Sequence, residues 1–456
     1  MPAVVPRGRW ATLDRVRHPI GPSWSPSPRA AVVLTALLLL VVAIAVAGWL
    51  HDWRLGVDSA VYRAGAVALL SGDPLYDSMS LPAEPWWALL PFTYPPPATV
   101  LFLPLTLLPV QLAWGAMAVL SILALALSIR VTLGSLPWQR DLESWYGRWG
   151  ATPAAVTVLF TVALLAIEPV WRTIALGQVN LVLMAVIMLD VLVLAARDHR
   201  LGGVLIGLAA AVKLTPLIFI PHLVLTGRVR AAVRAAVTFL VLQAVMVAVI
   251  PRDAVRFWGD AVIDPGRTGP IHWAGNQSIN GVVHRLTELA PWSFAVSVVV
   301  AGVAAVPAVW LVRRFHRDGQ PLPALLVTAF FGLLVSPVSW SHHWVWAVPL
   351  IVVLVARLGR PVQVRTRHRW QAFGVIAVFT SCVLLVLPNG RNLELHWSWW
   401  QHLLGSAYVA VPVVVALVLL GTGLRLGRSL WVPLGLRVPR GRAPTRDAGI
   451  SGGGRG

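Results

Sequence analysis

The sequence predicts an all-α polytopic membrane protein. Of its 456 residues, 57% are apolar and only 12% are charged, whereas about a quarter of the residues of a soluble domain carry charge. The mean hydropathy is +0.74. Apolar runs of about twenty residues recur from end to end, and each is long enough to cross ~30 Å of hydrocarbon. The runs are continuous rather than alternating, which favours helices over the strands of a barrel.

Ten apolar runs satisfy the length of a transmembrane helix. Two further segments, 95–109 and 201–226, are apolar but interrupted, the second at Lys213-Leu-Thr-Pro216, because the residue before a proline disfavours helix. We therefore expect about 11–12 transmembrane helices, including broken or re-entrant segments. The ten clear runs are 30–50, 111–133, 151–167, 179–196, 231–250, 292–312, 322–336, 344–356, 370–387 and 403–424.

The positions of the arginines predict which side of the membrane each loop faces. If segment 201–226 turns back instead of crossing, the loops on the side of the N-terminus hold 28 arginines and the opposite loops hold 8. Cytoplasmic loops are enriched in basic residues, so both termini are expected in the cytoplasm. The expected parts are a basic cytoplasmic tail at 1–29, a transmembrane domain at 30–426 with outer loops at 51–110 and 251–291, and a disordered basic cytoplasmic tail at 427–456.

The formal net charge of +19 raises the question of nucleic acid. Basic residues that flank spans and contact anionic headgroups explain this charge better, so membrane lipids and not nucleic acid are the expected partners. The sequence holds neither GxxxxGK[ST] nor GxGxxG, and its inner loops are too short for a nucleotide-binding domain. The single cysteine, Cys382, excludes a disulfide framework. No cofactor is expected, and the sequence leaves the oligomeric state open.

The stretch GVDSAVYRAGAVALL at 56–70 follows the first span on its outer side. Asp58 and Tyr62 are four residues apart and share one helix face, while small apolar residues form the other face. This pattern predicts a short amphipathic juxtamembrane helix. Asp58 caps that helix or serves as an exposed base, and the two roles are compatible because both require an accessible carboxylate.

Amides and an arginine gather on the same outer side. Gln178 and Asn180 enter a span at its outer end, where amides form interhelical hydrogen bonds or bind hydroxyl groups. The run NQSINGVVHR at 276–285 contains Asn276 and Gln277 and ends in Arg285. Its amides either bind hydroxyl groups or form a turn.

Three basic side chains complete the outer set. His342 and His343 are adjacent in SPVSWSHHW, in a short outer loop. They lack the spacing and the carboxylate of a metal site, so no metal is expected, and they suit a proton donor and cation for a phosphate. Lys213 lies at the break of segment 201–226, and broken helices at membrane depth line cavities. An intramembrane ionisable residue is a functional candidate by default.

Six motifs in order resemble one enzyme family over about 57–346. They are GVDSAVYRAGAVALLSGDPLYD, FTYPPPATVLFLPL, LGQVNLVLM, KLTPLIFIPHL, NQSINGVVHR and SPVSWSHHW. The chain resembles the polyprenol-phosphate-mannose-dependent α-1,2-mannosyltransferases of glycosyltransferase family 87, actinobacterial enzymes of the GT-C type. The resemblance implies an outward-facing active site in the cell membrane. It also implies a polyprenyl phosphate mannose donor and a glycolipid acceptor such as phosphatidylinositol mannoside, lipomannan or lipoarabinomannan.

The resemblance implies roles for individual residues as well. The family's acid after the first span, thought to be the catalytic base, maps onto Asp58. A β-linked donor that gives an α product is inverted, and inversion requires one base on the acceptor hydroxyl. The cations expected to hold the donor phosphate are His342, His343, Arg285, Lys213 and Arg172. The residues expected to bind sugar or acceptor are Tyr62, Gln178, Asn180, Asn276, Gln277 and Trp340.

Two alternatives stay open at the level of sequence. One keeps the enzyme and replaces the sugar by arabinofuranose, because nothing in the sequence separates a pyranose pocket from a furanose pocket. The other is a transporter or flippase of a lipid-linked sugar, with Lys213 and its broken helix as the midplane site. Against the second, the sequence shows no internal repeat, and its polar residues crowd one face only.

Overall fold

The computed structural model describes residues 27–148, 150–359 and 362–421, and within these ranges it contains helices and no β-strand. Residues 1–26 of the predicted N-terminal tail and the whole predicted tail 427–456 lie outside the described residues. The described ranges include six helices that are long and apolar enough to cross a membrane, which confirms the predicted class. They are α1 (Pro28–Leu50), α4 (Val110–Gly134), Asn180–Arg197, which begins with α8 (Asn180–Leu189), α11 (Val229–Val249), α14 (Ser293–Arg317) and Arg369–Val386.

The other predicted apolar runs form shorter or bent helices. The run predicted at 151–167 forms α6 (Pro153–Leu164) and then bends by 80° into α7 (Glu168–Leu176), a segment expected as loop. The shorter apolar helices are α3 with η1 (Pro97–Leu107), η4 with α10 (Thr215–Leu225), α15 (Pro321–Val335), η7 with α16 (Ser341–Ala356) and α20 (Ala407–Gly421).

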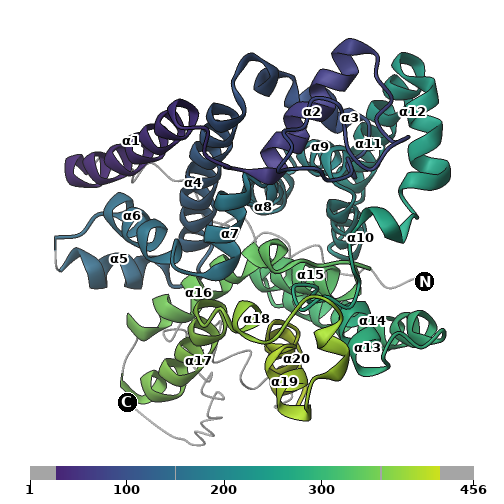
Figure 1. The fold of residues 1–456 in the computed structure, drawn as a ribbon. Helices are drawn as coiled ribbons and strands as arrows, with labels where there is room; N and C mark the ends of the chain where they lie inside the picture. Colours follow the sequence, from purple (N-terminus) through teal and green to yellow (C-terminus); the bar gives the residue numbers. More distant parts are fainter. Residues whose placement is uncertain (1–26, 149, 360–361, 422–456) are drawn as a thin grey trace, which may run out of the picture.

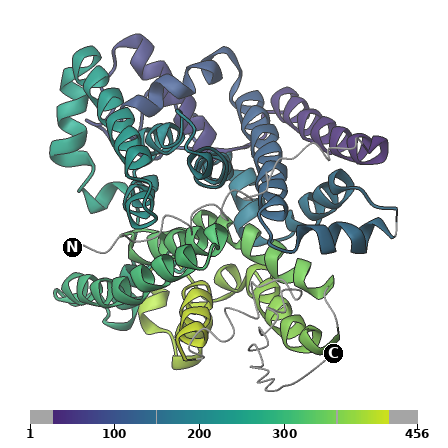
Figure 2. The same ribbon diagram turned by 180° about the vertical axis from the view of Figure 1, so that it is seen from behind.

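The helices form two groups that follow the order of the chain. In both views the elements up to α12 occupy the upper part of the molecule, and those from α13 onward occupy the lower part (Figures 1 and 2). α1 packs on α4, α9 on α11, and α14 on α15. The remaining α-helices are α2 (Val57–Ser71), α5 (Gln139–Gly147), α9 (Val204–Val212), α12 (Pro251–Arg256), α13 (Ile279–Leu286), α17 (Val362–Thr380), α18 (Val383–Val386) and α19 (Trp399–Leu404).

The break at Lys213 is confirmed. α9 ends at Val212, and the next residue, Lys213, has an extended backbone (φ −148°, ψ 133°). Helical structure resumes in η4 (Thr215–Ile218) and α10 (Phe219–Leu225). At the start of this segment Gly203 has φ +95°, and a Cβ there would lie 1.9 Å from the carbonyl oxygen of Ala231, near the start of α11. α10 leads directly into the start of α11. Both ends of the segment therefore lie at the same end of α11, which makes it a re-entrant hairpin.

α2 forms where expected but is less exposed than an amphipathic surface helix. Eight of its residues are buried, and it packs on α3, η1 and α4. The loop that follows α2 is tied to the second outer loop, because the Leu75 N–H donates to the Asp253 carboxylate (2.8 Å) and Arg267 donates to the Tyr76 carbonyl oxygen (3.0 Å). These two hydrogen bonds join the two long outer loops, 51–110 and 251–291.

Candidate active site

Two glycines set the position of Asp58. α2 begins at Val57 after Gly56, which has φ +69° and makes no side-chain cap. Asp58 is therefore not the cap of this helix. Gly177, with φ +68°, ends α7, and a Cβ there would lie 2.5 Å from the hydroxyl of Ser59. Since only glycine fits this approach, the start of α2 and the end of α7 are in direct contact.

Asp58 is half-buried in α2, which lies outside the membrane-spanning helices. Burial raises the pKa of Asp58 from 3.8 to about 6, and Lys213, Gln178 and Arg172 oppose this shift. Both cations therefore lie within electrostatic reach of the carboxyl. A carboxyl with this pKa is ionised at neutral pH and accepts a proton more readily than an exposed aspartate.

Two buried tyrosines hold Gln178 beside Asp58. The Tyr62 hydroxyl donates to the Gln178 carboxamide oxygen (2.7 Å), the Gln178 amide donates to the Tyr94 hydroxyl (2.9 Å), and the two hydroxyls are 2.9 Å apart. Tyr62 is fully buried and stacks on Phe102 with ring centroids 4.2 Å apart. Because Phe102 covers this ring, we assign Tyr62 to the support of Gln178 and not to contact with a sugar.

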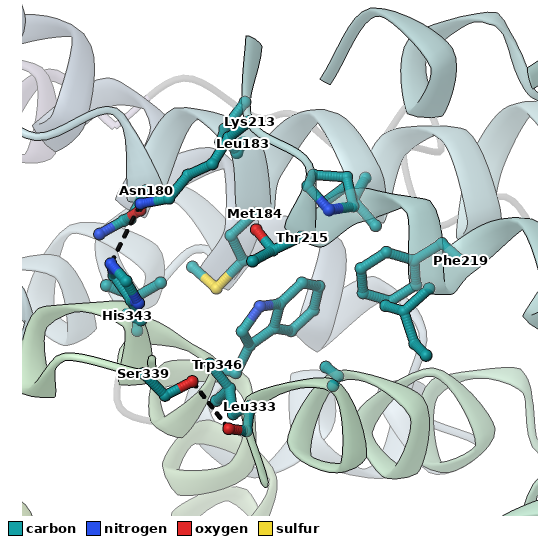
Figure 3. A pocket seen from close by; sticks show the side chains of 16 residues that line it. Asn180, Leu183, Met184, Lys213, Thr215, Phe219, Leu333, Ser339, His343 and Trp346 are labelled. Carbon is teal, nitrogen blue, oxygen red and sulfur yellow. Dashed lines mark hydrogen bonds between the residues drawn. The ribbon is translucent and has the colours of Figure 1, made fainter. Parts of the chain in front are cut away.

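Lys213, Asn180 and His343 meet at one end of a small pocket of about 50 Å³ (Figure 3). The Lys213 ammonium donates to the Asn180 carboxamide oxygen (3.1 Å) and lies 3.1 Å from Nε2 of His343. The rest of the wall is mostly apolar, with Phe219 and Trp346 labelled in the same view. The break at Lys213 thus places one ammonium group against two polar partners, next to a pocket with a hydrocarbon lining.

His342 is buried, and its imidazole ring makes no hydrogen bond within the part of the chain that the structure describes. Its side chain is 7% exposed, and neither ring nitrogen has a hydrogen-bond partner among the described residues. Its backbone carbonyl oxygen is held from two sides, by the Asn180 amide and by the Thr173 hydroxyl, each at 3.0 Å. Buried polar groups are nearly always satisfied in proteins. The free imidazole is therefore a group that a bound polar ligand would satisfy.

Glu168 fixes the histidine segment, although sequence reasoning did not single it out. This fully buried carboxylate accepts from Ser341 (2.7 Å), from Tyr408 (2.9 Å) and from Arg172 (3.3 Å). Ser341 directly precedes the two histidines, so Glu168 joins α7, η7 and α20. An acid four residues before Arg172, at the end of an apolar run, was the available sequence signal.

The predicted residues of the second outer loop have other contacts. The Asn276 carboxamide oxygen accepts from the Ser339 N–H (2.9 Å), and the Gln277 amide donates to two carbonyl oxygens at 2.7 and 2.8 Å. Arg285 is 1% exposed and donates to the carbonyl oxygens of Trp273 (3.2 Å) and Asn276 (3.0 Å). These side chains brace loops, and the structure does not bring their polar groups to Asp58.

The structure brings together Asp58, Gln178, Asn180, Lys213, His342, His343 and Arg172 from the predicted set. Tyr94, Glu168, Thr173 and Ser341 join them without having been predicted as site residues. Among the described residues, no group of three or more His, Cys, Asp or Glu side chains is arranged to hold a metal ion. The cluster unites two carboxyls, two cations and two imidazoles from α2, α7, η7 and the end of α9.

Comparison with known proteins identifies the family. The family model described as glycosyltransferase family 87 matches residues 92–337. The chain belongs to glycosyltransferase family 87. A polyprenol-phosphate-mannose-dependent alpha-(1-2)-phosphatidylinositol mannoside mannosyltransferase of Mycobacterium tuberculosis is 33% identical over 405 residues, which are 84% of this chain and 90% of the relative.

Further relatives of this family carry closely related names. The protein of the same name from Mycolicibacterium smegmatis is 32% identical over 412 residues, 86% of this chain and 92% of its own length. A phosphatidylinositol pentamannoside mannosyltransferase of Mycobacterium tuberculosis is 35% identical over 395 residues, 85% of this chain and 87% of its own. No solved structure matches the chain. The family and the helical architecture make this chain a multi-pass membrane glycosyltransferase.

Proposed function

We propose that the chain transfers mannose from polyprenyl phosphate mannose to a phosphatidylinositol mannoside through an α-1,2 linkage, with Asp58 as general base. The relatives described above are named for this donor and this class of acceptor. The observation that carries the proposal is a carboxyl with a raised pKa beside Lys213 and Arg172. A base and a pair of cations are what an inverting transfer from a phosphate requires.

The reaction is a single displacement. The acceptor hydroxyl oxygen forms a bond to the anomeric carbon while the bond from that carbon to the phosphate oxygen breaks. Asp58 takes the hydroxyl proton, and the bonding electrons leave with the polyprenyl phosphate. Proton transfer to a positioned base contributes about 10²–10⁴-fold in rate. The donor is β-linked in this proposal, so the product is α-linked.

The leaving phosphate is assigned to the Lys213 side of the cluster. Lys213 supplies the charge, Asn180 supports it, and the protonated ring nitrogen of His342 donates a hydrogen bond. Such charge-assisted bonds are about twice as strong as neutral ones. The small adjoining pocket has an apolar wall that includes Phe219 and Trp346. The proposed donor therefore places its phosphate at the polar end of this pocket, with its hydrocarbon next to apolar side chains.

The site is proposed to face the outside of the cell, with both termini in the cytoplasm. The segment 203–225 turns back and does not cross the membrane. With this topology, 28 arginines lie on the side of the N-terminus and 8 on the opposite side. This distribution supports a cytoplasmic location for the arginine-rich side. The loops that carry Asp58, Arg172 and His342 then face outward.

The test uses purified protein in lipid nanodiscs, radiolabelled polyprenyl phosphate mannose and a phosphatidylinositol mannoside. Asp58→Asn should fold and lose transfer by about 10²-fold or more. Asp52→Asn, an exposed aspartate six residues earlier, is the matched control and should keep wild-type activity. Near wild-type transfer by Asp58→Asn would exclude Asp58 as base. Preference for polyprenyl phosphate arabinose as donor would overturn the sugar assignment, and lipid translocation without transfer would overturn the enzyme.

A further inference from the structure

Two tryptophans from separate loops lie beside the histidine segment and have no part in the proposed displacement. Trp273 and Trp340 are both half-buried, and their ring centroids are 5.3 Å apart with 58° between the planes. The guanidinium carbon of Arg172 lies 5.4 Å from the centroid of the Trp273 ring. The pair, called here the tryptophan platform, thus offers accessible aromatic surface next to a cation.

The platform is held rigidly before any ligand binds. Trp340 forms a backbone bridge with Asn276, and the neighbouring Ser339 N–H donates to the Asn276 carboxamide oxygen at 2.9 Å. The Trp273 ring lies against Gly275, where a Cβ would approach the ring to 2.2 Å. The backbone of Trp340 and the ring of Trp273 are therefore fixed by contacts of the second outer loop. A preorganised aromatic surface loses little conformational entropy on binding.

Polar side chains border the platform. The indole N–H of Trp273 donates to the carboxamide oxygen of Asn389 at 3.3 Å, and His272 lies 2.9 Å from the carboxamide oxygen of Asn392. The Asn389 amide also donates to the Leu387 carbonyl oxygen at 2.8 Å, so Asn389 holds the Trp273 ring, whereas Asn392 is exposed. An aromatic surface with a carboxamide and an imidazole at its edge matches a hexopyranose, which presents a C–H face and a rim of hydroxyl groups.

The platform lies close to the reacting groups but on another side from the lipid pocket. Trp340 directly precedes Ser341, His342 and His343, and Arg172 acts electrostatically on Asp58 while it lies over Trp273. Neither tryptophan lines the pocket that contains Lys213. A ligand on the platform would therefore border Arg172 and the histidine segment without occupying the place proposed for the donor phosphate.

We propose that Trp273 and Trp340 form a subsite for a mannopyranosyl ring of the acceptor glycolipid. The inference rests on the proposed function, because it takes the donor to occupy the Lys213 side. The mannosyl ring stacks on the indole surface, and the exposed Asn392 carboxamide binds its hydroxyl groups. The subsite selects acceptors that already carry mannose and holds their hydroxyl for Asp58.

The test separates the KM for the acceptor from the KM for the donor. Trp273→Ala and Trp340→Ala should each raise the KM for the phosphatidylinositol mannoside about five- to tenfold and leave the KM for polyprenyl phosphate mannose unchanged. Trp340→Phe keeps an aromatic face and should restore most of the acceptor affinity. Trp86→Ala is the matched control, because Trp86 is 71% exposed on the first outer loop and should change neither constant.

Each other outcome has a defined meaning. An unchanged acceptor KM in both alanine variants would overturn the subsite, and a raised donor KM would assign the platform to the donor sugar instead. If an alanine variant melts below the wild type, Trp340→Leu, which keeps much of the side-chain volume and removes the aromatic face, replaces it in the same comparison. Absence of mannose transfer in the wild type would refute the proposed function itself, a result distinct from a failure of the tryptophan variants.

Discussion

The pKa of Asp58 makes the acid side of the pH–rate profile a direct test of its role. A general base must be ionised, so kcat/KM should rise with pH and level off above the pKa of that base. With a pKa of about 6, about one-tenth of Asp58 is ionised at pH 5, and kcat/KM should fall about tenfold from its plateau. An aspartate at 3.8 would stay more than about nine-tenths ionised there and would show no such fall.

Substitution of Lys213 tests whether the acid limb of the pH–rate profile reports the ionisation of Asp58. It is the strongest of the groups that lower the pKa of Asp58, ahead of Gln178 and Arg172. A cation within about 4–6 Å lowers an aspartate pKa by about 1–3 units. Lys213→Met should therefore raise the pKa of Asp58 and move the acid limb of the profile to higher pH, in addition to any loss of donor affinity. Arg172→Met should move the limb in the same direction by less.

The assay measures initial rates of radiolabelled mannose transfer at low donor and acceptor concentrations, from about pH 4.5 to pH 8. Arg54→Met is the matched control, because Arg54 is exposed, lies four residues before Asp58 and does not act on its pKa. Its profile should superimpose on the wild type. A wild-type profile that is flat down to pH 5, or a limb that Lys213→Met leaves in place, would refute the assignment of that limb to Asp58.

Three further predictions follow from the same contacts. Burial gives Asp58 a pKa of about 6 in the folded chain, above the ordinary value of 3.8. The fold therefore loses stability as the pH rises from 3.8 to about 6. Asp58→Asn removes this cost and should raise the melting temperature at pH 7.5. Glu168→Gln removes a buried charge from the histidine segment and should lower kcat about tenfold or more with a smaller change in acceptor KM, by the same rate assay. In a Cys382→Ser background, Ser78→Cys should react with an impermeant maleimide in intact cells and Arg230→Cys should not; the reverse pattern would place the site in the cytoplasm.

The fold was predictable where hydropathy and proline positions decide it. The break at Lys213 followed from a lysine and a proline inside one apolar run, and the structure places both ends of that segment at one end of α11. The 80° bend between α6 and α7 was not predicted. A hydropathy count measures the length of an apolar run but does not register a change of direction. The signal was Glu168-Pro169, because a proline favours the first turn of a new helix.

The site was predictable only in part, for a physical reason. Gln178, Asn180 and Lys213 interrupt apolar runs, where a polar group must find a partner, and the structure brings their side chains into one cluster. Asn276 lies in a polar loop and Arg285 in the short helix α13 that follows it, and there side chains serve equally well as braces for backbone carbonyl groups. Sequence alone does not distinguish a loop amide that binds substrate from one that holds the loop.

The electrostatics of the cluster connect donor binding to base strength. In the free protein Lys213 is shared, because it acts on Asp58 and is hydrogen-bonded to Asn180 and close to His343. A donor phosphate bound to the same ammonium adds a negative charge and offsets part of the stabilisation that Lys213 gives to the carboxylate. The carboxylate then holds a proton more strongly. Asp58 would thus become a better base when the leaving group is in place, so that activation of the acceptor depends on prior binding of the donor.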